Sequence, residues 1–95
     1  MIKRGRFRLI ASPDGRDGSV TIHRDVFLYA GVFDGDDTVD HPLAPGRKAY
    51  VHVARGGATI NGQPLTAGDA LRLTDETAVR LNHAHGAEVL LFDLD

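Results

Sequence analysis

Cysteine is absent from this chain of 95 residues. Its absence excludes disulfides, thiolate metal sites and a cysteine nucleophile. No apolar run approaches the roughly 20 residues of a membrane-spanning helix, so we expect no membrane span. A dominant charge is also missing, because 11 basic and 13 acidic residues leave a net charge of −2. That balance gives no electrostatic footprint for a nucleic acid.

Signals for export and for helices are missing as well. The first six residues lack the apolar core of a signal peptide, and we therefore expect a cytoplasmic location. No stretch has convincing helical periodicity. What the chain does contain is eleven glycines and four prolines that separate short apolar runs. This pattern is typical of an all-β sandwich or barrel, and residues 1–95 are predicted to form a single domain.

Eight or nine short strands are predicted from these runs. Residues 26–33 and 87–94 are largely apolar and predict two core strands. Residues 41–46 predict a loop, because their two prolines cannot donate hydrogen bonds to a strand ladder. Residues 83–85 predict a second loop, directly before the final strand. Asn61 and Gly62 predict a tight hairpin turn, since a type I′ turn needs two residues that tolerate positive φ.

The core follows from alternation along these strands. In residues 50–53, for example, the two valines face one way and Tyr50 and His52 face the other. We predict that the core includes Leu9, Val20, Ile22, Phe27, Val51, Val53, Ile60, Leu65, Leu71, Leu73, Val79, Leu81, Val89, Leu91 and Phe92.

Residues 49–69 are the most informative segment of the chain. A strand, a glycine corner at 56–57, a second strand, the Asn-Gly turn and a Gly-Asp entry to a third strand follow one another. This order resembles the central hairpin of a cupin. The resemblance implies an all-β fold: a single cupin, or double-stranded β-helix (jelly-roll) barrel, built of two facing antiparallel sheets.

Four separated motifs narrow the resemblance further. They are SPDGRDGS at residues 12–19, IHRD at 22–25 followed by Leu28 and Tyr29, VHVARG at 51–56, and EVLLFDL at 88–94. In this order they resemble the C-terminal cupin domain of bacterial pirin-like proteins. The resemblance covers nearly the whole chain after Phe7.

The pirin resemblance implies a two-cupin relationship. Pirin-like proteins carry two cupin domains, and some bacterial members act as quercetin 2,3-dioxygenases. In that family the metal lies in the N-terminal cupin, on three histidines and a glutamate. This chain resembles the C-terminal half alone, as a natural single cupin or as an excised domain. An N-terminal metal-binding cupin is therefore one expected partner.

Metal binding is the first candidate chemistry, because the chain has five histidines and imidazole suits iron, nickel, copper or zinc. Metal cupins place an H-x-H pair before the central hairpin, and that pair is missing here. We therefore expect no metal site and no cofactor. A site, if one forms, would have to draw on His41, His52, His83 and His85. The acidic run at residues 34–40 lacks the features of an EF-hand loop and predicts a solvated turn.

Binding of a small aromatic ligand is the second candidate. Tyr29, Tyr50, His52 and Arg55 are predicted to supply the polar contacts if they face the barrel interior. For His52 the favoured prediction is an outward position, because Val51 and Val53 are expected to pack inside.

Three functions follow for the chain. The preferred one is a cupin domain without metal or catalysis of its own, which serves a structural, dimerising or partner-cupin role. A homodimer is expected, because hiding apolar edges helps a domain of this size. The alternatives are a metal-dependent dioxygenase of the quercetinase kind and a barrel that binds a small molecule.

Overall fold

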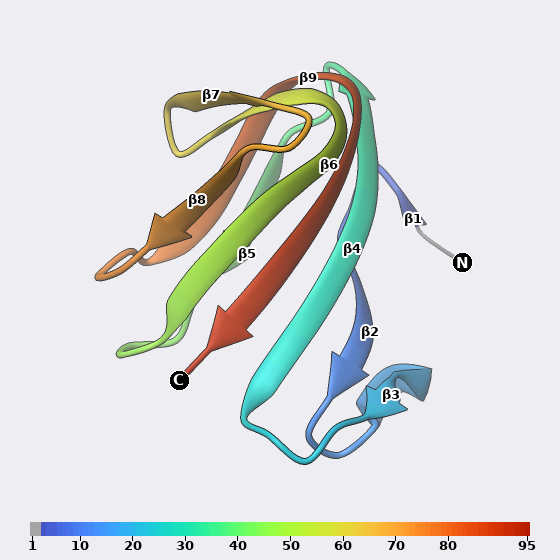
Figure 1. Cartoon of the computed structure of the whole chain (residues 1–95), viewed down its shortest axis with the longest axis vertical. Coiled ribbons are helices and arrows are strands. Elements are labelled where there is room, and N and C mark those ends of the chain that lie inside the picture. Colours follow the sequence, from blue (N-terminus) through green and yellow to red (C-terminus); the bar gives the residue numbers. More distant parts are fainter. Residues whose placement is uncertain (1–2) are drawn as a thin grey trace.

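Strands make up nearly the whole fold (Figure 1). The structure is a computed structural model that describes residues 3–95, and for Lys3 and Arg4 it describes the backbone alone. The strands are β1 (Lys3–Arg4), β2 (Arg8–Ser12), β3 (Val20–Thr21), β4 (Val26–Gly35), β5 (Val39–Pro42), β6 (Lys48–Ile60), β7 (Gln63–Thr66), β8 (Ala70–Leu73) and β9 (Ala78–Leu94). Within the described residues, a 3-10 turn at Arg16–Gly18 is the sole helical segment. It is far too short to cross a membrane. The all-β prediction is confirmed.

The strands form one open sheet that folds over into two facing layers. We call them the wide layer, with the order β3-β2-β4-β9-β6-β8, and the narrow layer, with the order β5-β9-β6-β7. Strands β6 and β9 belong to both, because each curves over at one end of the molecule (Figure 1). The predicted pair of facing sheets is confirmed, but these two strands are long, and the prediction of short strands throughout is wrong.

The fold-over occurs where β6 and β9 bend side by side. Strand β6 bends at Gly56, whose φ is +65° and where a side chain would collide with the backbone oxygens of His85 and Gly86. Strand β9 bends next to it, with φ values of 50° at His83 and 54° at Gly86. The predicted loop at residues 83–85 is wrong, because pairing continues through the bend and places Gly57 opposite His85. The glycine and the polar histidines mark a bulged corner within a strand.

The core lies between the layers. Val51, Val53, Val89 and Leu91 of the wide layer are fully buried, as predicted from the alternation. Ile60, Leu73, Val79 and Leu81 are buried as well, and Leu65 and Leu71 are half-buried against them. Leu9, Ile22 and Phe27 are predicted as core and are half-buried. Phe92 is a wrong core prediction: it lies opposite Leu28 and Tyr50, and its parity is opposite to that of the buried Leu91, so it points away from the core.

Val20 is a wrong core prediction, with 67% of its surface exposed. It lies in β3, a two-residue strand at the edge of the wide layer that pairs in parallel with β2. Alternation assigned Val20 to the same face as Ile22, but an edge strand this short has no second layer above it. Its side chain therefore reaches solvent.

The predicted loop at residues 41–46 is partly wrong. His41 and Pro42 close β5, where they lie opposite Val79 and Ala78 of β9. Strand β5 is at the edge of the narrow layer, and a proline is tolerated there because no further strand needs its missing N–H. The loop begins only at Leu43, which turns into the core.

The predicted hairpin turn is confirmed at the end of β6. Asn61 and Gly62 have φ values of 47° and 82°, and β7 pairs back onto β6. The Asn61 amide donates to the carbonyl of Ala78 at 3.0 Å, and its oxygen accepts from the N–H of Arg80 at 2.6 Å. The turn residue thus also ties β6 to the start of β9.

Candidate functional site

An aromatic cluster lies between the two layers and comes from strands of both. Tyr29 of β4 and His41 of β5 meet with ring centroids 4.4 Å apart. Phe7 lies against His41 at 5.8 Å and against the fully buried Phe33 at 5.0 Å. All three contacts are edge-on, the arrangement that aromatic quadrupoles favour. Of the four predicted ligand-binding residues, Tyr29 alone turns into the sandwich, and it does so to pack against other rings.

A buried ion pair borders this cluster. Asp93 occupies an inward-facing position of β9, and Arg47 donates to its carboxylate at 2.8 Å and to its backbone oxygen at 3.0 Å. Arg47 also pairs with Asp25 at 2.9 Å and lies over the ring of Phe27 at 5.5 Å. The side chains of Arg47 and Asp93 are only 16% and 13% exposed. Such a charge pair holds the ends of β9 and β6 together, provided that both partners are present.

Burial sets the protonation state of the two inward polar rings. It raises the pKa of the Tyr29 phenol, and the negative charge of Asp93 raises it further. Burial lowers the pKa of His41, although Asp93 acts in the opposite direction. At neutral pH both rings are therefore uncharged. An uncharged histidine packed between aromatic rings serves as a core residue and not as a general acid.

The described residues of this chain do not gather a metal set like the three histidines and one glutamate that the pirin resemblance implies for the N-terminal cupin. Of the candidates, His41 is inside the sandwich and His52 is on the outer face of the wide layer, between the inward Val51 and Val53. His83 and His85 are exposed at the bend of β9. Among the described residues, no three histidine or carboxylate side chains gather into a group that could hold a metal ion.

His83 and His85 border a groove of their own. They line a hollow of about 170 Å³ together with Pro64 and Leu65 of β7. The groove lies on the narrow layer and is separate from the aromatic cluster. Two imidazoles and an apolar wall are too few ligands for a specific metal site.

The acidic run at residues 34–40 contains the predicted turn at 36–38, but its first two residues end β4 and its last two begin β5. Asp37 accepts a hydrogen bond from the N–H of Asp34 at 2.9 Å, and Asp34 accepts from the N–H of Gly86 at 2.9 Å. These carboxylates cap backbone donors of the turn and of the β9 bend. They are structural residues.

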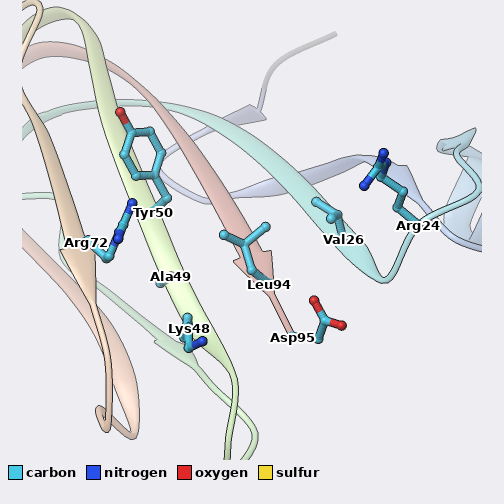
Figure 2. Close-up of a pocket in the computed structure, with 8 residues that line it drawn as sticks. All are labelled: Arg24, Val26, Lys48, Ala49, Tyr50, Arg72, Leu94 and Asp95. Atoms are coloured by element: carbon cyan, nitrogen blue, oxygen red, sulfur yellow. The ribbon is translucent and has the colours of Figure 1, made fainter.

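A larger groove lies on the outer face of the wide layer (Figure 2). Its volume is about 430 Å³, and its floor is apolar, formed by Val26, Ala49 and Leu94. Tyr50 stands beside it, 37% exposed, with its ring 6.0 Å from that of Phe92. The remaining lining residues are charged: Arg24, Lys48, Arg72 and Asp95.

The four predicted ligand-binding residues are therefore not brought together. Tyr29 is inside the sandwich, Tyr50 and His52 lie on the outer face of the wide layer, and Arg55 is exposed at the bend of β6. Sequence reasoning missed Arg47 and Asp93. One signal was available for Asp93: Val89 and Leu91 set the inward parity of β9, and that parity continues to Asp93.

The sequence comparisons agree with one another. The profile of the quercetinase C-terminal cupin domain matches residues 9–94. Quercetin 2,3-dioxygenase of Escherichia coli K12 is 39% identical over 87 residues, which are 92% of this chain and 38% of that protein. A putative quercetin 2,3-dioxygenase of Pasteurella multocida is 31% identical over 88 residues, which are 90% of this chain and 38% of that protein. The chain thus spans about two fifths of the length of these relatives.

Solved structures give the same result. The crystal structure of the bacterial pirin YhhW from Escherichia coli, in complex with nickel(II), superposes with a TM-score of 0.91 at 36% identity. The match covers 99% of this chain and 40% of that one. An RmlC-like cupin from Desulfovibrio desulfuricans has the same fold at 15% identity, with a TM-score of 0.65 over 94% of this chain and 82% of that chain. This chain belongs to the family of quercetinase C-terminal cupin domains, the C-terminal cupin of pirin-like proteins.

Proposed function

We propose that this chain is a cupin domain without metal chemistry of its own, and that it stabilises a companion protein surface. The dispersal of its histidines carries the proposal. His41 is packed against Tyr29 and Phe7, His52 faces outward, and His83 and His85 lie at the bend of β9. Aromatic side chains and the pair of Arg47 and Asp93 occupy the interior beside His41, which supports the proposal.

The companion is either a metal-binding cupin or a second copy of this chain. The relatives named for quercetin 2,3-dioxygenation are much longer than this chain, so a further domain is available in each of them. We assign the dioxygenation in their names, and the nickel in the YhhW crystal, to such a companion domain. The cytoplasmic location expected from the sequence belongs to the same proposal.

Metal analysis tests the first half of the proposal. Untagged protein, purified without chelator, is analysed by mass spectrometry for bound metal and then titrated calorimetrically with ferrous iron, nickel, copper and zinc. We expect far less than one metal per chain. His83→Ala/His85→Ala serves as the control for adventitious binding at the exposed histidine pair.

One result contradicts the proposal. A stoichiometric metal that is lost in His41→Ala, but retained in His52→Ala and in the His83/His85 double variant, would place a metal ligand inside the sandwich. The dioxygenase function would then move to this chain. Oxygen uptake with quercetin in the metal-loaded protein would complete that reversal.

A further inference from the structure

The outer face of the wide layer is unusually apolar for a solvent-facing sheet. In one row across three strands, Leu28, Phe92 and Tyr50 lie side by side, and the neighbouring row holds Val26 and Leu94. These positions alternate with the buried ones, so they point away from the core. We call this surface the apolar face. It consists of Val26, Leu28, Tyr50, Leu90, Phe92 and Leu94, all of which are partly or largely exposed.

The narrow layer provides an internal comparison. Its outward positions include the polar pairs of Asp40 with Arg80 and of Thr59 with Asn82. They also include Pro64, which lies opposite Thr59, and Pro42, which lies opposite Ala78. The outer face of the narrow layer is mixed and has no large apolar side chain in these pairs, whereas the outer face of the wide layer carries a contiguous group of large apolar side chains. A contiguous apolar surface with a polar rim is the mark of an interaction site.

The rim of the apolar face is positively charged. Arg24, Lys48 and Arg72 line the groove, and Figure 2 shows Lys48 and Arg72 on one side of Leu94 and Arg24 on the other, beyond Val26. Within the described residues, none of these three side chains makes an ion pair or a hydrogen bond, in contrast to Arg16, Arg47 and Arg80. Asp95 is the one carboxylate in the same groove. The groove thus has three cationic side chains and one carboxylate, which leaves an excess of positive charge.

We propose that the apolar face is the docking surface of this domain, and that its partner is a companion protein domain with an apolar patch bordered by carboxylates. This inference rests on the proposed function and specifies the surface and the chemistry of the partner. Charge complementarity favours such a partner over a second copy. Two apolar faces stacked together would bring two sets of Arg24, Lys48 and Arg72 to one interface, and like charges there are costly. The relatives also have the additional chain that could supply the partner.

The test uses the Escherichia coli K12 quercetin 2,3-dioxygenase, with this chain in place of the segment that it matches. Hydroxyl-radical footprinting with mass spectrometry measures side-chain exposure in the hybrid protein and in this chain alone. We expect the oxidation rates of Tyr50 and Phe92 to fall severalfold in the hybrid. The rates of Pro64 and His83, on the narrow layer, should not change.

Charge reversal tests the chemistry of the partner. Lys48→Glu combined with Arg72→Glu should restore oxidation of Tyr50 and Phe92 in the hybrid to the rates of the free chain. Both residues are exposed, so the variant should fold, and circular dichroism of the free chain checks this. Arg80→Glu, an exposed reversal on the narrow layer, is the matched control and should leave the protection unchanged.

Other outcomes overturn the inference in distinguishable ways. Protection of the narrow layer in place of the apolar face would refute the docking surface and leave the supporting role intact. Absence of protection anywhere, with the two parts of the hybrid unfolding independently, would refute the proposed function as well. Sedimentation of the free chain as a dimer with Tyr50 already protected would identify a second copy as the occupant. Protection that survives charge reversal would refute the acidic partner.

Discussion

Asp93 is a carboxylate at an inward position of a core strand, and Arg47 makes that position tenable. The guanidinium donates to the carboxylate and to the backbone of the same residue, and its face rests on Phe27. The pair is mostly shielded from water. A shielded pair of this kind adds little to stability beyond what apolar residues would, yet the loss of one partner leaves the other charge uncompensated.

Replacement of Arg47 should therefore lower the free energy of unfolding, and a second substitution at Asp93 should restore most of it. Arg47→Met removes the cation and leaves Asp93 facing the core, and we expect a loss of about 1–3 kcal/mol in the free energy of unfolding. Arg47→Met/Asp93→Leu should recover most of that loss. Urea denaturation monitored by circular dichroism measures both. Arg80→Met is the control, because it removes an exposed pair with an N–O distance of 3.9 Å. It should cost less than about 0.5 kcal/mol. Equal losses for Arg47→Met and Arg80→Met would show that burial of the ion pair plays no part.

His41 should make the stability depend on pH. Burial lowers its pKa below the ordinary value of 6.5, so the unfolded chain takes up its proton at a higher pH than the folded chain does. Stability is then fully present above 6.5 and is lost as the pH falls through the lowered pKa, with a slope of at most about 1.4 kcal/mol per pH unit.

Urea denaturation between pH 8 and pH 5, in steps of about half a unit, measures that slope. His41→Phe keeps an aromatic ring against Tyr29 and removes the titrating group, so it should flatten the profile. His52→Phe, the same replacement at an outward histidine, is the matched control for the loss of one imidazole. An unchanged slope in His41→Phe would assign the pH dependence to other groups.

The sequence predicted whether a side chain faces the core wherever strand alternation is sufficient. It did not predict which side chains meet across the sandwich. Val51, Val53, Val89 and Leu91 follow from strand parity alone, and all are buried. The contact of His41 with Tyr29 depends on how two layers face each other, which no local pattern specifies. Alternation predicts that Tyr50 lies on the face of β6 opposite to the valines. It does not predict that Tyr50 lies beside the groove, because the groove forms only when β6 pairs with β9.

At the scale of elements, the two bends determine the architecture. Strand β6 leaves the wide layer and enters the narrow layer at Gly56, against the bend of β9. The position demands a left-handed φ and leaves no room for a side chain beside His85 and Gly86. The glycine pair at residues 56–57 predicted this corner from the sequence. Its consequence, one strand that serves two layers, did not follow from the sequence.

Gly56→Ala and Gly62→Ala separate the cost of a left-handed φ from the cost of a side chain that has no room. Gly62 has a positive φ with open space around it, so alanine there should cost about 1–2 kcal/mol through backbone strain alone. Gly56→Ala adds a collision with the backbone of β9 and should cost clearly more than that, or prevent folding. Thermal unfolding of the two variants in parallel provides the measurement. Equal losses would show that the bend can open to admit a methyl group.

Pro42 and residues 83–85 show why element boundaries were harder to predict than element types. Both places carry signals that commonly end strands: Pro42 itself in the first, and Gly86, directly after residues 83–85, in the second. The structure tolerates the proline at a strand edge and converts the glycine into a bend within β9. The same residue types serve as breaks or as bulges, and the choice depends on which strands lie alongside.

At the scale of the molecule, the two layers cannot unfold separately. Strands β6 and β9 each contribute hydrogen bonds to both layers, and they pair with each other along most of their length. We expect a single calorimetric transition with equal calorimetric and van't Hoff enthalpies. Scanning calorimetry tests this directly. Two resolved transitions would mean that the bends uncouple the layers.

The sharing of β9 also determines when the domain can fold. Strands β4, β5 and β6 all take their partner from β9, which comes after them in the chain. During synthesis these segments leave the ribosome before their common partner exists, and pairings between distant segments close slowly in any case. Until β9 emerges, the inward side of β6, with Val51, Val53 and Ile60, is uncovered, and the edge of this strand is unpaired. The nascent chain, more than the finished domain, is therefore the form of this protein that most needs protection from aggregation.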